Sequence, residues 1–487
     1  MSLPHFPILR AGREYESLDR IELCSHRDGS PVASVSQANA GIIKRDLKKA
    51  AKNAAILRAI PTSQLIERCQ AAAEIFMEAT LPVGGEHTQT VDEYVAALSA
   101  TSGLPHSLCR GNMEKCALVL REMPTILRGL LRGMDPSVID GGRGNGIATH
   151  SVATHDGVPV WYTPNTDSLG AVLPSNSPGV HSLWLPSIAL GTPVVLKPGK
   201  EEPWTPMRLV RAMMAAGIPA EAFSLYPTDH EGAGVVLEST GRALLFGDAK
   251  VAAKYAGDES IEIHGPGRSK VLFGADEAAN WEEYMDVLVA SVAGNGGRSC
   301  INASAIYTPS HASEIATALA ERLAELAPKD HTDEAAGLAA FAKPAFADAM
   351  DSAIEAGLAK GGARDLCAEQ RGTPRRAEHG GAAYLLPTVV LCDKQDHALA
   401  NTEYMFPFVS VVQVPQDQML DCIGPSLVVS AITRDQVFLD GLLSSAEIQR
   451  LNLGPLPTSK VEWDQPHEGN LFEFLYSRRA LQRAQGW

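Results

Sequence analysis

Apolar and charged residues recur at helical spacing in two long stretches of the first third of the chain. Residues 37–79 form the first stretch and residues 108–134 the second, and both predict amphipathic helices. Residues 1–37 are mixed and polar, so we expect an irregular N-terminal arm. Strand-like residues stand on both sides of Asp156-Gly157, a pair that favours the tight turn of a β-hairpin.

From Ser168 onwards, short apolar runs alternate with helical stretches. Ser177-Pro178 can cap and open a helix that runs to Leu190, where Gly191 ends it. Repeated units of this kind predict a parallel sheet covered by helices, and two sets of them predict two α/β domains with a cleft between them. The Ala- and Gly-rich residues 334–363 predict a surface helix pair. The predicted strands lie at 169–173, 194–196, 223–226, 244–246 and 261–263, with a second set near residues 271, 305, 389 and 411.

Length and composition are those of an ordinary globular protein. The chain has 487 residues, 45% apolar and 20% charged, which is enough for about two to four structural units. Its net charge of −15 argues against a nucleic-acid or acidic-membrane surface, because either requires clustered Lys and Arg. We find no run of about 20 apolar residues and no basic, apolar leader, so we expect no membrane span and a cytoplasmic protein.

The eight cysteines have none of the paired spacings of metal or redox sites. No C-x-x-C pair and no zinc-type spacing occurs, so we expect no metal centre. In a chain of this length such cysteines are typical of the reduced thiols of a cytoplasmic protein.

One cysteine stands in a context that favours chemistry. Residues 295–300 read N-G-G-R-S-C, a glycine-bearing loop immediately before a predicted strand. A thiol in such a loop is exposed and close to backbone N–H groups, which lower its pKa and make it a nucleophile. A lone cysteine is more often buried and inert, so the interpretation depends on the sequence around it.

Several segments, taken in order, resemble the aldehyde dehydrogenase superfamily. The pattern N-x-G-x-x-C at 295–300 resembles its nucleophile motif, and P-S-N-S-P at 174–178 resembles its P-W-N-F-P segment, with serine for both aromatics. T-E-Y-M-F-P at 402–407 resembles its E-E-I-F-G-P. The resemblance covers residues 145–310 and the region near 400. Further matches in order are L-P at 185–186, G-T-P-V-V-L-K-P at 191–198, T-P at 205–206 and A-G-I-P at 216–219.

The resemblance implies an α/β fold of two Rossmann-like parallel-sheet domains with a small β oligomerisation element. The cofactor-binding domain would comprise residues 1–146 and 165–264, and the catalytic domain residues 265–466. Residues 147–164 and 467–487 would build the oligomerisation element of a homodimer or homotetramer.

The resemblance also assigns roles to two catalytic residues. Cys300 would attack an aldehyde or acyl carbonyl, and Asn176 would donate its amide to the developing oxyanion together with the Cys300 backbone N–H. Hydride transfer to a nicotinamide would then leave a thioester on Cys300. Outside this context, Asn176 would be read as a turn residue at a helix entry.

For the nicotinamide cofactor, the resemblance points to four residues. Lys197 is similar to the lysine that contacts the adenosine ribose, and Glu403 to the glutamate that binds the nicotinamide ribose. Gly247-Asp248 falls where the family has Gly-Ser beside the pyrophosphate. Asp248 departs from that pattern, and because a carboxylate repels phosphate we expect it to cap the following helix instead.

Lys200 bears on the choice between NAD and NADP. Many family members carry a glutamate at this position, which grips the ribose hydroxyls of NAD. A lysine would instead attract a 2′-phosphate, which favours NADP mildly.

The general base has competing candidates in I-E-I-H-G-P-G-R at 261–268. Hydrolytic members carry E-L-G-G-K here, and aligning on the glutamate makes Glu262 the base. Aligning on G-P-G puts Ile263 at that position and resembles the acylating branch, where coenzyme A takes the acyl group. A one-residue shift turns a side chain to the opposite face of a strand, so the two alignments predict different chemistry. His264 is a third candidate base. We favour Glu262.

The sequence therefore predicts an NAD(P)-dependent oxidation of an aldehyde through a thiohemiacetal and thioester on Cys300. The alternatives are a CoA-acylating aldehyde dehydrogenase that works as an acyl-CoA reductase, and a non-catalytic member of the fold. Retention of Cys300, Asn176 and Glu403 together argues against the last. The expected partner is a small aldehyde or acyl-CoA, and the sequence does not name it.

Overall fold

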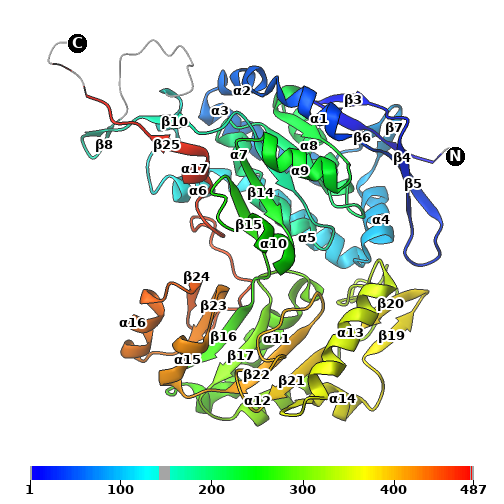
Figure 1. Cartoon of the computed structure of the whole chain (residues 1–487), viewed down its shortest axis with the longest axis vertical. Helices are drawn as coiled ribbons and strands as arrows, with labels where there is room; N and C mark the ends of the chain where they lie inside the picture. The colour runs from blue at the N-terminus through cyan, green and yellow to red at the C-terminus, as the bar shows by residue number, and fades with distance from the viewer. Residues whose placement is uncertain (1–2, 142–153, 483, 485–487) are drawn as a thin grey trace.

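The computed structural model describes residues 3–141, 154–482 and 484, and two seven-stranded sheets form its centre (Figure 1). Five neighbouring strands of the first sheet are parallel, and β2 and β3 add an antiparallel edge. The strands, in spatial order, are β15 (Ile261–His264), β14 (Arg242–Phe246), β11 (Leu169–Val172), β12 (Val194–Lys197), β13 (Phe223–Leu225), β2 (Ile8–Arg10) and β3 (Arg13–Tyr15).

Both faces of the first sheet are buried because its apolar runs alternate between two helical layers. Val194 and Leu196 pack into the large core on one face, whereas Val195 packs into a second core on the other. The larger core includes residues of α3 (Thr62–Glu78), α5 (His106–Arg121) and α8 (Trp204–Ala215), and the smaller one residues of α1 (Ala40–Leu47) and α9 (His230–Ser239). Other helices of this half are α2 (Ala50–Arg58), α4 (Val91–Ser102), α6 (Met123–Leu130), α7 (Pro186–Ala189) and α10 (Ala249–Tyr255).

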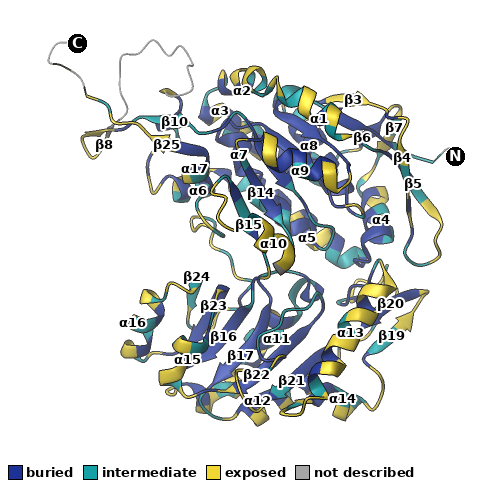
Figure 2. Ribbon diagram, in the orientation of Figure 1, coloured by how far each residue is buried: buried dark blue, intermediate teal, exposed yellow. Residues whose placement is uncertain are grey.

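The second sheet has six parallel strands and one antiparallel edge strand, β18. Helices cover both faces, with their exposed sides turned to solvent (Figure 2). The helices are α11 (Met285–Ala293), α12 (Ala312–Leu323), α13 (Pro344–Leu358), α14 (Leu366–Arg371), α15 (Gln416–Cys422) and α16 (Gln436–Ser444). The strands, in spatial order, are β18 (Ala363–Asp365), β21 (Thr388–Cys392), β22 (Phe408–Gln413), β17 (Ala303–Thr308), β16 (Ser269–Phe273), β23 (Ser426–Ile432) and β24 (Ile448–Leu453).

A small β element lies beside the first sheet and joins distant parts of the chain (Figure 1). β10 (Tyr162–Pro164) pairs antiparallel with β25 (Tyr476–Arg478), which follows α17 (Leu471–Leu475). The predicted hairpin forms between β8 (Thr154–His155) and β9 (Val158–Pro159), across Asp156-Gly157. Residues 147–153, 483 and 485–487 of the predicted oligomerisation element lie outside the described residues.

The prediction of an irregular arm over residues 1–37 is wrong. Besides β2 and β3, this segment contributes a three-stranded sheet of β1 (His5–Phe6), β5 (Pro31–Ser36) and β4 (Arg20–Cys24). The pair β6 (Leu81–Gly84) and β7 (His87–Gln89) lies beside it. The predicted helix from Ser177 is also shorter than expected: a 3-10 turn (Pro178–Leu183) precedes α7.

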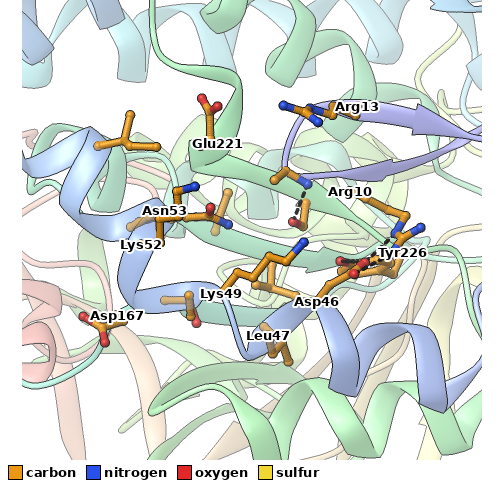
Figure 3. Close-up of a pocket in the computed structure, with 18 of the residues that line it drawn as sticks. Arg10, Arg13, Asp46, Leu47, Lys49, Lys52, Asn53, Asp167, Glu221 and Tyr226 are labelled. Carbon is orange, nitrogen blue, oxygen red and sulfur yellow. Dashed lines mark hydrogen bonds and ion pairs between the residues drawn. The ribbon is translucent and has the colours of Figure 1, made fainter.

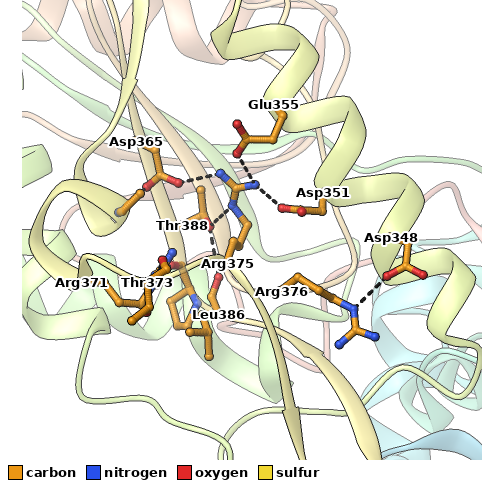
Figure 4. A network of polar contacts seen from close by, with 12 residues as sticks. Asp348, Asp351, Glu355, Asp365, Arg371, Thr373, Arg375, Arg376, Leu386 and Thr388 are labelled. Atoms are coloured by element: carbon orange, nitrogen blue, oxygen red, sulfur yellow. Dashed lines mark hydrogen bonds and ion pairs between the residues drawn. The ribbon is translucent and has the colours of Figure 1, made fainter.

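The Ala- and Gly-rich region forms a single helix, α13, rather than a helix pair. Arg375 anchors this helix to the second sheet through a buried guanidinium (Figure 4). Its nitrogens contact Asp351 Oδ1 of α13 at 2.5 Å, Asp365 Oδ2 of β18 at 2.7 Å and Thr388 Oγ1 of β21 at 3.0 Å. Arg375 directly precedes the hairpin of β19 (Arg376–His379) and β20 (Ala382–Leu385).

No helix in the described part of the chain is long and apolar enough to cross a membrane.

Candidate active site

A cavity of about 600 Å³ lies between the two sheets and contains Cys300. The loops that follow β11, β14 and β15 line it from the first sheet, and those that precede β17 and β22 line it from the second. The carboxyl ends of parallel strands are where α/β proteins bind ligands, because the loops there converge. Asn176, His264, Glu403, Glu468 and Lys115 share this cavity with Cys300.

The loop before Cys300 has a conformation that its sequence explains. Asn295, Gly296 and Gly297 all have positive φ, which glycine adopts freely and asparagine tolerates. A Cβ on Gly297 would stand 2.3 Å from the Pro407 nitrogen, so only glycine fits. The Asn295 amide donates to Ser177 Oγ and to Ser299 Oγ, both at 3.0 Å. The nucleophile loop is thus tied to the segment at 174–178.

Cys300 is a partly exposed residue whose thiol is electrostatically held in its neutral form. Burial raises the pKa of this thiol to about 12, and the carboxylates of Glu468 and Glu403 act in the same direction. The Lys115 ammonium and the Cys300 backbone N–H act against them. The thiol therefore has to lose its proton as it reacts.

Asn176 reaches the same loop from the first sheet. Its Nδ2 donates to the Arg298 carbonyl at 3.0 Å and contacts the Met405 sulfur at 3.5 Å. Sulfur is a weak acceptor, so the second N–H has a partner that a developing oxyanion would displace. Arg298 itself is buried, and its guanidinium donates to the carbonyls of Ser102 and Ala340.

The three residues considered for the general base lie on the two opposite faces of β15. Ile263 packs into the apolar cluster on one face with Leu245 and Ile261. Glu262 and His264 lie on the other face, as the strand period of two requires. His264 lines the cysteine cavity, whereas Glu262 lines a smaller neighbouring cavity of about 80 Å³. Ile263 therefore does not face the cysteine cavity, and Glu262 lies next to that cavity without lining it.

The sequence analysis did not identify three ionisable residues of the cavity. Glu468 and His467 come from the C-terminal segment that the sequence assigned to oligomerisation, and Lys115 comes from α5. Burial lowers the pKa of Lys115, and burial and Arg450 lower that of His467 well below its usual value. The string P-H-E-G at 466–469, polar residues in a turn-forming tail, was the one available signal.

At the start of α10, Asp248 caps the helix as expected. Its Oδ1 accepts hydrogen bonds from the N–H groups of Lys250 at 2.9 Å and Val251 at 3.0 Å. Gly247 and Asp248 both line the cysteine cavity. Because Asp248 uses these two amides, they are not free for a pyrophosphate.

The predicted adenosine-side residues lie at the end of β12 and just beyond it. Lys197 is largely buried, and this burial lowers its pKa, whereas Lys200 is exposed. The adjacent Glu201 spans the two halves of the molecule, since its carboxylate accepts from Ser175 Oγ at 2.9 Å and contacts Lys343 Nζ at 2.7 Å. Sequence reasoning assigned no role to Glu201 or Lys343.

Glu403 lies at the junction of the two sheets. Its Oε2 accepts the Arg268 backbone N–H at 2.7 Å, and burial raises its pKa to about 7. It lines the same cavity as Cys300.

A second cavity of similar size, about 610 Å³, lies at the amino ends of the first sheet's strands (Figure 3). Its deepest charges are already paired: Arg10 binds Asp46 through two contacts of 2.6 Å, and Tyr226 donates to Asp46 at 3.0 Å. It contains no cysteine and none of the residues of the nucleophile motif. We therefore take the cavity that contains Cys300 as the candidate active site.

Comparisons with known proteins agree with this architecture. The crystal structure of an NAD-dependent aldehyde dehydrogenase from Sinorhizobium meliloti has a TM-score of 0.78 at 19% identity, covering 100% of this chain and 96% of that one. An indole-3-acetaldehyde dehydrogenase solved with NAD⁺ has a TM-score of 0.76 at 17% identity, covering 97% and 95%. At such identities the likeness shows the fold.

The relatives found by sequence match only part of this chain. Malonate-semialdehyde dehydrogenase of Bacillus subtilis (strain 168) is 26% identical over 293 residues, 57% of this chain and 56% of that protein. 2-Hydroxymuconic semialdehyde dehydrogenase of Pseudomonas sp. (strain CF600) is 26% identical over 239 residues, 45% of each. This chain spans about half the length of the curated relatives it matches.

The model of the aldehyde dehydrogenase family matches residues 13–421, which include the segments of Asn176, Cys300 and Glu403. The chain belongs to the aldehyde dehydrogenase family.

Proposed function

We propose that the protein oxidises an aldehyde with NAD(P), through a thiohemiacetal and then a thioester on Cys300. The observation that carries the proposal is that Cys300, Asn176 and Glu403 line one cavity although they come from three distant segments. A non-catalytic member of the fold would have no need to keep these three side chains together.

In the first step, Cys300 Sγ attacks the aldehyde carbon. Negative charge develops on the carbonyl oxygen, where the Asn176 amide and the Cys300 backbone N–H stabilise it until this oxygen takes up the thiol proton as the hydroxyl of the thiohemiacetal. Because the thiol's resting pKa is about 12, attack and proton loss have to be coupled within the cavity.

The residues around the cavity also fit a nicotinamide dinucleotide. Gly247 and Glu403 line the cysteine cavity, and Lys197 lies at the end of β12 on the same edge of the sheet. When bound, the oxidised nicotinamide supplies the hydride acceptor. Lys197 would contact the adenosine ribose, and Glu403 would bind and orient the nicotinamide ribose. The exposed Lys200 would accept a 2′-phosphate, which favours NADP over NAD.

Coenzyme A is the second candidate acceptor for the acyl group. Glu262 lines the neighbouring cavity rather than that of Cys300, and this favours an acceptor that brings its own thiol. The carboxylate of Glu468, however, lines the cysteine cavity and supports water as the acceptor. We therefore keep hydrolysis as the main proposal and the acylating reaction as the alternative.

We further propose that β10 and β25 belong to the surface through which a cytoplasmic homodimer or homotetramer forms.

The test is an assay of the purified protein on a panel of aldehydes. Reduction of NAD or NADP is followed at 340 nm, with and without coenzyme A, and Cys300→Ser serves as the matched control. Turnover that Cys300→Ser abolishes, with nicotinamide binding intact, supports the proposal. Reduction at an equal rate in Cys300→Ser would refute the role of Cys300. Turnover only with coenzyme A would select the acylating alternative.

A further inference from the structure

Three ionisable side chains stand in a line across the wall between the cysteine cavity and its smaller neighbour. Oε2 of Glu468 forms a hydrogen bond with Nδ1 of His264, and Nε2 of His264 lies 3.8 Å from Oε1 of Glu262. Glu468 and His264 line both cavities, whereas Glu262 lines only the smaller one. The line therefore leads from the space around Cys300 into the second cavity.

Fold and packing fix this line. Glu262 and His264 are alternate residues on one face of β15, and Glu468 comes from the segment before α17, about two hundred positions later. The Phe246 ring stacks on the imidazole with a centroid distance of 4.6 Å, which sets the plane of the His264 ring. Nε2 of His264 is buried and makes no hydrogen bond to the described residues. A buried polar atom without a partner is costly and rare unless it has a task.

We propose that Glu468 is the general base that activates water against the acyl group on Cys300, and that His264, which faces Glu262 on its other side, is the positioning residue that holds the Glu468 carboxylate. This inference rests on the proposed function, because it concerns the discharge of the Cys300 thioester. The role of base thus passes from Glu262, which the sequence favoured, to Glu468.

The step balances without a further reactant. An O–H bond of water breaks and its proton moves to the Glu468 carboxylate, while the water oxygen bonds to the thioester carbon. The C–S bond then breaks and leaves its electron pair on Cys300 Sγ, which takes the proton back from Glu468. The product leaves the cavity as the carboxylic acid and loses its own proton to solvent. His264 donates its Nδ1–H to the Glu468 carboxylate before and after the step.

The electrostatics of the cluster agree with these roles. The charge of Glu468 is felt at Cys300, where it helps to raise the pKa of the thiol. That high pKa makes the departing thiolate a ready acceptor for the proton on Glu468.

The first experiment separates acylation from discharge of the thioester. Glu468→Gln should keep the initial burst of reduced nicotinamide, slow the later turnover by ~10²–10⁴-fold and accumulate acyl-enzyme on Cys300, visible by intact mass. Hydroxylamine, which attacks a thioester without a base, should restore turnover and yield the hydroxamate. Glu473→Gln is the matched control, because Glu473 lies in the adjoining helix α17, is exposed and pairs with Arg132 at the surface.

The second experiment addresses the positioning of Glu468 by His264. His264→Leu removes the donor to Glu468, whereas His264→Asn retains a donor near the Nδ1 position. His264→Leu should preserve the burst and lower steady-state turnover several-fold, and His264→Asn should recover part of that loss. A purely structural loss would lower burst and turnover together.

Full steady-state turnover of Glu468→Gln with no acyl-enzyme would overturn the proposal, as would a wild-type protein that discharges its thioester only to coenzyme A. If Glu468→Gln does not fold, Glu468→Ala with added formate is used instead, and absence of rescue in a folded Glu468→Ala counts against the base. A wild-type protein that reduces no nicotinamide with any aldehyde refutes the proposed function itself, which is a distinct result.

Discussion

Gly267 lies so close to Cys300 that a Cβ on it would stand 2.0 Å from the Cys300 carbonyl oxygen and 3.1 Å from the Cys300 Cβ. The same carbonyl accepts a hydrogen bond from Ser269 Oγ at 2.9 Å. The G-P-G loop after β15 therefore positions Cys300, the proposed nucleophile, by direct backbone contact, apart from any role in choosing the acyl acceptor.

Gly267→Ala should reduce kcat by ~10²-fold, because the added methyl has to push the Cys300 backbone away and small misplacements of a nucleophile are costly. Gly265→Ala is the matched control, since no atom of the described residues lies within 4 Å of a Cβ there. The comparison is made on initial rates, together with thermal melting to verify the fold. Equal rates for the two variants would contradict the positioning role.

Asn176→Ala should lower kcat by ~10²–10³-fold and leave the cofactor dissociation constant unchanged, because one oxyanion donor is removed from the reacting centre. Fluorescence titration with the nicotinamide cofactor measures the second quantity. The amide also holds the Arg298 carbonyl at 3.0 Å, so a melting curve is recorded for both proteins. A rise in KM alone, with kcat intact, would indicate a structural role instead.

The parallel strands were predictable because their apolar runs are buried on both faces. The N-terminal strands were not, because they are two to six residues long and partly exposed: all three residues of β3, Arg13–Tyr15, face solvent. Without a buried face, a strand leaves no alternating pattern in the sequence. Its pairing partner, β2, is largely buried, but this burial results from the folded sheet and could not be predicted from three residues.

The same distinction between local pattern and folded context applies to the residues of the site. Cys300 and Asn176 stand in local motifs with fixed spacing, so the sequence could nominate them. Glu468 and Lys115 stand in no such motif, and the fold alone brings them to His264 and Cys300. Likewise, the sequence could not show which face of β15 Glu262 and His264 occupy. That face depends on the register of the strand, and the two alignments gave different registers.

Lys200→Glu should weaken NADP binding far more than NAD binding, because the substitution replaces an attraction for the 2′-phosphate by a repulsion. Lys394→Glu is the control, since Lys394 is also exposed and lies beyond the carboxyl end of β21, away from the cysteine cavity. Dissociation constants for both cofactors are measured at two salt concentrations, because an exposed charge is screened by salt. A similar loss for NAD and NADP would show that Lys200 does not read the phosphate.

The Glu262 carboxyl should make the folded protein less stable as the pH rises. Its pKa moves from 4.5 to about 7 because burial disfavours the charged form, and Glu468 adds to this while His264 opposes it. A raised carboxyl pKa stabilises the folded state fully below pH 4.5, and this contribution is lost as the pH rises through 7.

Glu262→Gln does not titrate, so its free energy of unfolding relative to the wild type should grow between pH 5 and pH 8, by at most about 3 kcal/mol. The raised pKa of His264 changes stability in the same direction, and His467 and Lys115 line the same small cavity, so the difference between the proteins, not either curve alone, is the quantity to follow. Urea unfolding at four pH values measures it, with Glu259→Gln, exposed just before β15, as the control that should run parallel to the wild type. Parallel curves for Glu262→Gln and the wild type would show that this carboxyl ionises in the folded state as freely as in the unfolded one.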